Sequence, residues 1–116
     1  MFRIVCEPLP ELGAYRLIKS VIIEGILIEA PYDWNGASVP IFLWPIIGSP
    51  FEPRFMAPSL VHDKVYDTGE MPRDEADLLF RKLLIHNGVD KERAETMYRG
   101  VQYFAGSYYN KGVCYA

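Results

Sequence analysis

Hydrophobic positions in the first 30 residues follow the pattern of short β-strands. Residues 2–6 and 15–28 are rich in Val, Ile, Leu and Tyr, which strands favour. Two prolines and Gly13 separate these segments, and Gly25 marks a bulge or a turn inside the second one. The pattern predicts an antiparallel hairpin or meander over residues 1–30.

Residues 31–57 are apolar but lack a regular period. The Asn35-Gly36 pair is a strong turn signal, so a tight loop should follow the last strand. From Ile41 to Phe55, repeated prolines exclude a regular helix. We expect an irregular apolar flap or short helical turns there, with the region around Trp44 covering the mouth of a cleft.

The second half of the chain follows the 3.6-residue period of helices. Pro58 suits a first helical turn and predicts a helix from about Pro58 to Tyr66. A second helix should run from about Pro72 to His86, and a third should begin after an N-cap at Asp90. The apolar stripe of the third helix consists of Ala94, Met97, Tyr98, Val101, Phe104 and Ala105.

Together these elements predict one α+β domain of 116 residues. An N-terminal antiparallel β hairpin or meander should pack on a three-helix C-terminal unit over residues 58–106, followed by a tyrosine-rich tail at residues 107–116. Half of the residues are hydrophobic, and a chain of this size buries a core without metal or disulfide support. Cys6 and Cys114 lack metal-ligand spacing, so we expect free thiols, with pairing across the termini as the alternative.

The charge balance excludes one class of partner. A net charge of -3 and a pI near 5.3 provide no basic face for nucleic acid. Apolar runs stay well below the roughly 18 residues of a membrane-spanning helix, and the N-terminus lacks the pattern of a signal peptide. We therefore expect no nucleic-acid partner, no transmembrane segment and no export through a signal peptide.

A histidine beside a carboxylate marks residues 60–67 as the stretch where chemistry is best supported. In a helix, His62 and Tyr66 lie one turn apart on the same face. The link to the second helix is short, so the two helices should be antiparallel neighbours. His62 and Asp77 each lie about 6 Å back from that link along their helices, so their side chains can meet.

Such a contact would make His62 a general base. Asp77 would accept a hydrogen bond from one ring nitrogen and raise its basicity, while the other nitrogen takes a proton from water. Tyr66, or Tyr98 from the third helix, would donate to Asp77 and keep it ionised. His62, Asp77 and Tyr66 are therefore the candidate catalytic residues. The alternative is a satisfied polar cluster that only locks the helices in register.

Asp63 should point in a different direction and is a candidate metal ligand. With Asp33 and the backbone carbonyls around Asn35-Gly36, it offers the hard oxygen ligands that Ca²⁺ or Mg²⁺ prefers. The cation would polarise an ester or phosphoryl oxygen, and N–H groups of the glycine turn would help hold the oxyanion.

The order of these motifs resembles a known family. The segments that carry the resemblance are Asp33–Pro40 with Trp44, Leu60–Tyr66, Glu75–Phe80 and Met97-Tyr98. They are similar to the phage and prophage family catalogued as domain of unknown function 1353. That resemblance spans roughly residues 22–109 and implies a bacteriophage or integrated-phage origin, without an established activity.

A second resemblance is local. Residues 62–67, followed by residues 76–80, are similar to the paired active-site helices of phospholipases A2, particularly the compact viral enzymes. This resemblance implies that His62 is the general base, Asp63 a calcium ligand and Asp77 the carboxylate partner of the histidine. The usual glycine-rich calcium loop is missing from the sequence, as are the disulfides of the secreted enzymes.

Two hypotheses about function follow. In the first, the chain is a phage- or prophage-encoded, hydrolase-like protein that uses His62 and Asp77, with Ca²⁺ or Mg²⁺ on Asp63 and Asp33. In the second, it is a virion, tail or assembly component, or a module that binds a host protein, and the cluster is purely structural. Its partners would be phage structural or host proteins, with lipid contact only under the phospholipase-like hypothesis. Both hypotheses locate the protein in the host cytoplasm or the virion.

Overall fold

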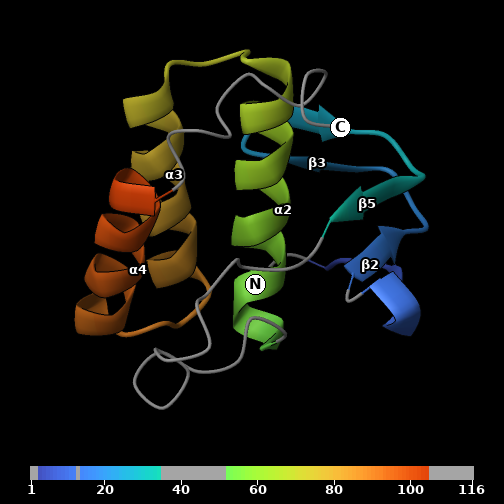
Figure 1. The fold of residues 1–116 in the computed structure, drawn as a ribbon, viewed down its shortest axis with the longest axis horizontal. Helices are drawn as coiled ribbons and strands as arrows, with labels where there is room; N and C mark the ends of the chain where they lie inside the picture. Colours follow the sequence, from blue (N-terminus) through green and yellow to red (C-terminus); the bar gives the residue numbers. More distant parts are fainter. Residues whose placement is uncertain (1–2, 13, 35–51, 105–116) are drawn as a thin grey trace.

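The computed structural model describes residues 3–12, 14–34 and 52–104 (Figure 1). In this part of the chain the strands come first: β1 (Cys6–Leu9), β2 (Ala14–Leu17), β3 (Val21–Ile23), β4 (Ile26–Ile28) and β5 (Tyr32–Trp34), with the short 3-10 helix η1 (Pro10–Leu12) after β1. The helices α2 (Pro53–Thr68), α3 (Arg73–His86) and α4 (Lys91–Phe104) follow. This order confirms the predicted α+β fold.

The strands form two small antiparallel units. One sheet has the order β1-β2-β5, and β3 pairs with β4 in a separate hairpin. Glu24 and Gly25 connect β3 to β4 with φ angles of 51° and 76°. Positive φ at both central residues suits a tight hairpin turn, so Gly25 marks a turn rather than a bulge.

Strand limits differ from those predicted. The predicted run over residues 15–28 is divided into β2, β3 and β4, because the polar Lys19-Ser20 pair and the Glu24-Gly25 turn interrupt it. β1 begins at Cys6, where the predicted first strand ended.

β5 corrects the prediction that residues 31–57 are irregular throughout. Tyr32–Trp34 pairs with β2, and Arg16 of β2 forms an ion pair with Asp33 at 2.9 Å. Tyr32 and Trp34 lie on the other side of the strand, where Trp34 is buried against the core. The predicted loop at Asn35-Gly36 and most of the predicted flap lie outside the described residues.

α2 begins five residues earlier than predicted. Pro53 occupies its first turn, and Pro58, the predicted start, lies inside the helix. Pro58 has no N–H to donate to the carbonyl of Arg54, four residues before it. Asn87 replaces that donor, because its side-chain Nδ2 lies 3.2 Å from the Arg54 carbonyl oxygen. The helix then ends at Gly69, whose φ of 67° is the left-handed conformation of a glycine cap.

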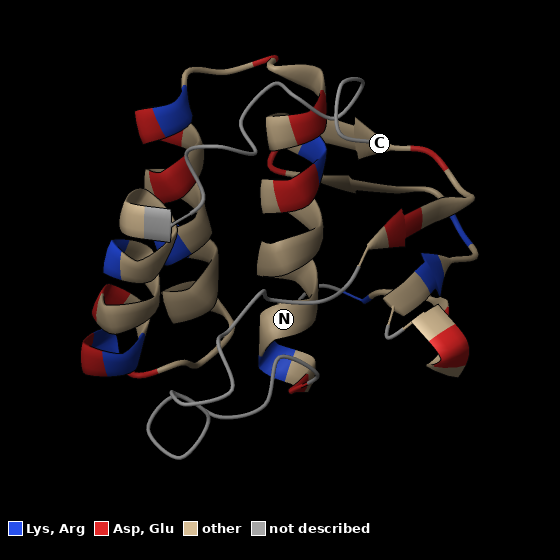
Figure 2. Cartoon of the chain, in the orientation of Figure 1, with Lys and Arg blue, Asp and Glu red and all other residues tan. Residues whose placement is uncertain are grey.

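α2 is the central element, with the strands on one side and α3 on the other (Figure 1). Charged residues on α2 lie toward its two ends, and its middle turns carry none (Figure 2). A helix that packs on both sides needs apolar residues around most of its circumference, and Leu60, Val61 and Val65 are all buried. α4 lies on the outer side and packs on α3 through a second core that includes Phe80 and Met97.

The predicted limits of α3 and the predicted start of α4 are confirmed within one residue. Asp90 caps α4 as predicted, since its Oδ2 accepts a hydrogen bond from the backbone N–H of Arg93 at 3.2 Å. Cys6 is a free thiol, whereas Cys114 and the predicted tail at residues 107–116 lie outside the described residues. None of the described helices combines the length and apolar character needed to cross a membrane.

Candidate functional site

His62 of α2 and Asp77 of α3 meet as the helix geometry predicts. The Nε2 atom of His62 lies 2.8 Å from Oδ1 of Asp77. Both residues are buried, with 7% and 1% of their surfaces exposed. Because an ionised Asp77 only accepts hydrogen bonds, Nε2 carries the hydrogen, and in the neutral ring the lone pair is on Nδ1. In the described parts of the chain, Nδ1 makes no hydrogen bond.

Tyr66 is the hydroxyl that donates to Asp77. Its O–H donates to Oδ1 of Asp77 at 2.5 Å, on the same oxygen that His62 contacts. Burial and then this hydrogen bond raise the pKa of the Tyr66 hydroxyl, so it remains a donor at neutral pH. Tyr98, the alternative donor, instead accepts a hydrogen bond from Gln102 at 2.9 Å.

Aromatic rings fix the position of the imidazole. The His62 ring centroid lies 4.1 Å from that of Tyr66 and 5.0 Å from that of Phe80. The histidine is therefore held on α2 by its neighbour one turn later and on α3 by both Phe80 and Asp77. Little freedom remains for the ring to rotate away from the carboxylate.

Arg73 completes the cluster and was missed by sequence reasoning. Its Nε donates to the Tyr66 hydroxyl at 3.3 Å and lies 3.9 Å from Oδ2 of Asp77. Its Nη2 donates to the backbone carbonyls of Val101, at 3.3 Å, and Gln102. The signal was available, because Arg73 stands four residues before Asp77 on α3, the spacing of a helical ion pair.

We call His62, Tyr66, Arg73 and Asp77 the α2–α3 cluster. It joins a carboxylate to an imidazole, a hydroxyl and a guanidinium, and Arg73 links it to the end of α4. Both oxygens of the Asp77 carboxyl group therefore have a polar neighbour, the Tyr66 hydroxyl at Oδ1 and the Arg73 guanidinium near Oδ2. An imidazole that gained a proton at Nδ1 would form an ion pair with Asp77.

A different face of α2 holds a second acid, Asp63. It lies between Ser59 and Asp67, one turn from each, on the side that contacts β5. Trp34 of β5 donates to the Ser59 hydroxyl at 3.1 Å, and the Tyr32 hydroxyl donates to Oδ2 of Asp67 at 2.5 Å.

Asp63 is only partly exposed, and the protein atoms packed around it withdraw its carboxyl group from water. This desolvation, with the nearby charge of Asp67, raises the pKa of Asp63 to about 8. In the described residues the Asp63 side chain makes no hydrogen bond or ion pair.

Asp33, the other predicted metal ligand, is not brought together with Asp63. Its side chain projects from β5 on the side opposite Tyr32 and Trp34, which contact α2. Arg16 holds it through two hydrogen bonds of 2.9 and 3.1 Å and lowers the pKa of the carboxyl group. The described residues contain no group of three or more His, Cys, Asp or Glu side chains placed to hold a metal. The predicted Ca²⁺ or Mg²⁺ site therefore gains no support from this geometry.

Two cavities lined by described residues lie on the strand side. One, of about 390 Å³, is lined by Arg16, Pro31, Tyr32 and Asp33. The other, of about 300 Å³, is lined by Arg3, Val5, Lys19, Ser20 and Val21. Neither is lined by His62 or Asp77.

Comparison with known proteins places the chain in a family without an assigned activity. It is 34% identical over 67 residues to the uncharacterized protein y4jT of Sinorhizobium fredii, and 29% identical over 70 residues to the uncharacterized protein y4iH of the same organism. These alignments cover 58% and 60% of this chain but only 20% and 29% of the two relatives, so the chain spans less than a third of their length. No solved structure matches. The family described as "Protein of unknown function (DUF1353)" matches residues 14–101, and the chain belongs to it.

Proposed function

We propose that the chain is a hydrolase in which His62 activates water. The observation that carries this proposal is the 2.8 Å contact between His62 Nε2 and Asp77 Oδ1. It gives the imidazole the orientation and the carboxylate partner that a general base needs. The proposal that the protein is encoded by a phage or prophage rests on sequence resemblance alone.

In the proposed step, Nδ1 of His62 removes a proton from water as the water oxygen attacks the carbonyl carbon of an ester. The imidazolium formed is stabilised by Asp77 through the Nε2 hydrogen bond. When the carbon–oxygen bond to the leaving alcohol breaks, the imidazolium returns its proton to that alcohol. The products are a carboxylic acid and an alcohol, and the enzyme regains its starting protonation.

Tyr66 and Arg73 act on Asp77 rather than on the substrate. Tyr66 donates to Oδ1 and Arg73 lies 3.9 Å from Oδ2, so both hold the carboxyl group in place beside His62. We propose a carboxylic ester, with a phospholipid as the first candidate, because the local resemblance to phospholipases A2 covers this same pair of helices.

A second candidate function is a non-enzymatic role as a virion, tail or assembly component, or as a binder of a host protein. The burial of the α2–α3 cluster favours it, since both His62 and Asp77 are more than nine-tenths buried. Through Arg73 the cluster also fastens α2, α3 and the end of α4 together. A cluster with these links stabilises the fold whether or not it reacts.

The variant His62→Gln separates the two candidates. A glutamine amide can still donate to Asp77 but cannot take a proton, so folding should be retained while general-base catalysis is lost. Wild type and variant would be assayed on 4-nitrophenyl butyrate and on phosphatidylglycerol vesicles, each with calcium and with EDTA. We expect His62→Gln to lower the rate by about 100-fold or more.

His86→Gln is the matched control, because His86 lies at the exposed end of α3 and should not affect the rate. The hydrolase proposal fails if wild type hydrolyses neither substrate faster than His62→Gln. The structural role is then tested by His62→Ala, which leaves Asp77 without one of its donors. It should reduce the free energy of unfolding by about 1–3 kcal/mol.

A further inference from the structure

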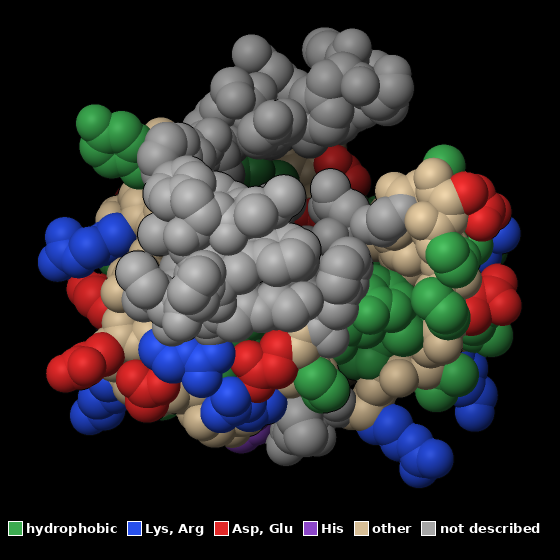
Figure 3. Space-filling model, turned by 60° about the horizontal axis from the view of Figure 1, so that its bottom comes forward, with side chains coloured by type: hydrophobic (Ala, Val, Ile, Leu, Met, Phe, Trp, Pro, Cys, Tyr) green, Lys and Arg blue, Asp and Glu red, His purple; other side chains and the backbone are tan. Residues whose placement is uncertain are grey.

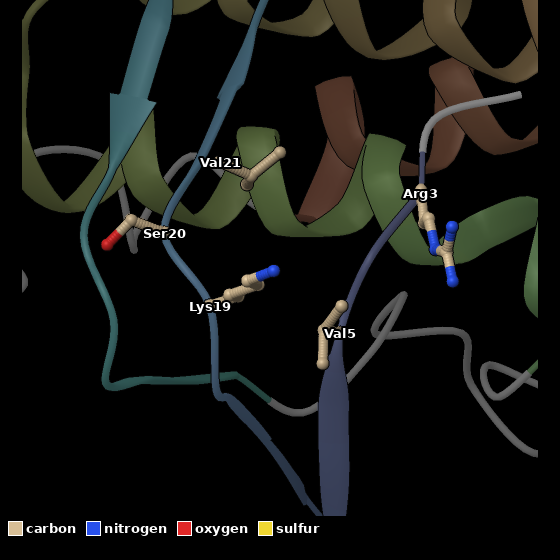
Figure 4. A pocket seen from close by; sticks show the side chains of 5 residues that line it. All are labelled: Arg3, Val5, Lys19, Ser20 and Val21. Atoms are coloured by element: carbon tan, nitrogen blue, oxygen red, sulfur yellow. The ribbon is translucent and has the colours of Figure 1, made fainter.

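A cavity on the strand side is lined by two basic residues. Its volume is about 300 Å³, and it is lined by Arg3, Val5, Lys19, Ser20 and Val21 (Figure 4). The segment before β1 supplies the first two of these residues, and the segment that leads into β3 supplies the others. A backbone hydrogen bond of 2.8 Å from Ile18 N–H to the Val5 carbonyl joins the two segments.

Figure 4 shows the Lys19 ammonium directed toward the segment that carries Arg3 and Val5. The Ser20 hydroxyl points away from them, in keeping with its role as acceptor for the Ala30 N–H at 2.8 Å. The polar character of the cavity therefore comes mainly from the two cations, with Val5 and Val21 as apolar walls.

Arg3 and Lys19 make no hydrogen bond or ion pair within the described residues. Several other cations in the described residues are paired with carboxylates: Arg16 with Asp33, Arg81 with Glu95, Lys82 with Glu24 and Arg93 with Glu52. The chain carries a net charge of -3, so acidic partners are plentiful, yet none lines this cavity. Two like charges at one cavity repel each other unless an anion lies between them.

Two exposed apolar residues flank residues 19–21, the segment that lines one side of the cavity. Hydrophobic side chains reach the surface on the strand side of the molecule (Figure 3). Ile18 and Ile22, which flank the lining segment, are 48% and 66% exposed. The cavity thus joins two positive charges to apolar walls, and its volume is at the lower end of the range for small-molecule sites.

We propose that this cavity binds a phosphate group. A guanidinium offers two parallel N–H donors to phosphate oxygens, and an ammonium adds a compact positive charge. The shared ligand chemistry is the doubly charged phosphate, whether free, in a small monoester or in a lipid headgroup. The inference is independent of the reaction at His62, because neither Arg3 nor Lys19 belongs to the α2–α3 cluster.

The test is a titration of ¹⁵N-labelled protein with sodium phosphate at constant ionic strength, followed by NMR. Saturable shifts are expected for the amides of residues 3–5 and 19–21. Arg3→Gln and Lys19→Gln should each weaken binding by about tenfold or more, because each removes a charged hydrogen bond. Lys91→Gln is the matched control, since Lys91 is an exposed lysine on α4 outside the cavity.

Vesicles distinguish the two sources of phosphate. The protein would be sedimented with vesicles of phosphatidic acid in phosphatidylcholine. The ligand is a lipid headgroup if wild type and Lys91→Gln sediment with the vesicles, Lys19→Gln does not, and free phosphate gives no saturable shifts. Saturable shifts with free phosphate alone assign it to a soluble ligand. The proposal is overturned if neither probe binds, or if the response to both probes is the same in Lys19→Gln and Lys91→Gln. Retained dispersion of the amide spectra confirms that each variant folds.

Discussion

The two acids that lie beside α2, Asp77 and Asp63, have very different surroundings. On the side of α3, Asp77 accepts hydrogen bonds from His62 and Tyr66 and lies 3.9 Å from the Arg73 guanidinium. On the side of β5, Asp63 has no described hydrogen-bond partner, and its pKa is raised to about 8. Asp77 therefore has hydrogen-bond donors and a nearby cation. Asp63 is withdrawn from water and has neither among the described residues.

This difference shows that two acids beside the same helix can have very different polar surroundings. Burial disfavours the charged form, and donors or nearby cations restore it. Asp77 is the more deeply buried of the two, yet it is the one with partners. The general base that we propose needs a carboxylate partner, and the described residues pair a histidine with a carboxylate on the α3 side of the helix.

The largest expected effect comes from Asp77→Asn. The amide keeps the shape of the side chain but removes the charge opposite Arg73, and its NH₂ cannot accept from the donors around it. We expect the free energy of unfolding to fall by about 2–4 kcal/mol. Urea denaturation at pH 7 measures this loss. Asp74→Asn, an exposed acid on the same helix, should change it by less than about 0.5 kcal/mol. Equal effects of the two substitutions would contradict a stabilising role for the contacts that Asp77 makes with His62, Tyr66 and Arg73.

Asp63→Asn should act in the opposite direction. The folded pKa of about 8 lies above the value of roughly 3.9 expected in the unfolded chain. Between these pH values the unfolded chain releases the proton and the folded chain keeps it, so stability declines as the pH rises from about 4 to about 8. Asparagine does not ionise, so the variant should be more stable than wild type at pH 8 by at least about 1 kcal/mol and similar to it near pH 4.

Thermal unfolding between pH 4 and pH 8 tests this prediction. Among the described residues, Asp67 is the charge that acts on Asp63, and Tyr32 of β5 donates to Asp67 at 2.5 Å. Lys64, the next residue along α2, lies 5.6 Å from the Tyr32 ring. Asp33→Asn is the control. Arg16 lowers the pKa of Asp33, so the loss of this carboxyl group should not reduce the decline in stability between pH 4 and pH 8. Stability curves of wild type and Asp63→Asn that run parallel across this range would contradict the raised pKa.

The smallest effect is expected from Asp67→Asn. Removing a like charge should lower the pKa of Asp63, since Asp67 is the second cause of its elevation. The Tyr32 hydroxyl can still donate to the amide oxygen of the new side chain, so the free energy of unfolding should change by less than about 1 kcal/mol. Carboxyl ¹³C NMR titration of Asp63 measures the shift. An unchanged titration of Asp63 would leave desolvation as its cause.

The α2–α3 contact was predictable because it depends on local rules. Helical rise and a short link place His62 and Asp77 at the same level, and both quantities can be counted along the sequence. β5 was missed because its three residues form a strand only through pairing with β2 and packing on α2, which no local pattern encodes. The start of α2 was misplaced because two prolines, Pro53 and Pro58, both suit a first turn. Pro58 can lie inside the helix because Asn87, far along the chain, donates to the Arg54 carbonyl in its place.

Because of Asn87, the first turn of α2 depends on a side chain that follows the end of α3. The opening turn of α2 lacks a main-chain donor at Pro58, and the amide just past the end of α3 supplies it. The Arg54 side chain also donates to the Gly88 carbonyl at 3.0 Å, so the start of α2 and the end of α3 should form and unfold as one cooperative unit.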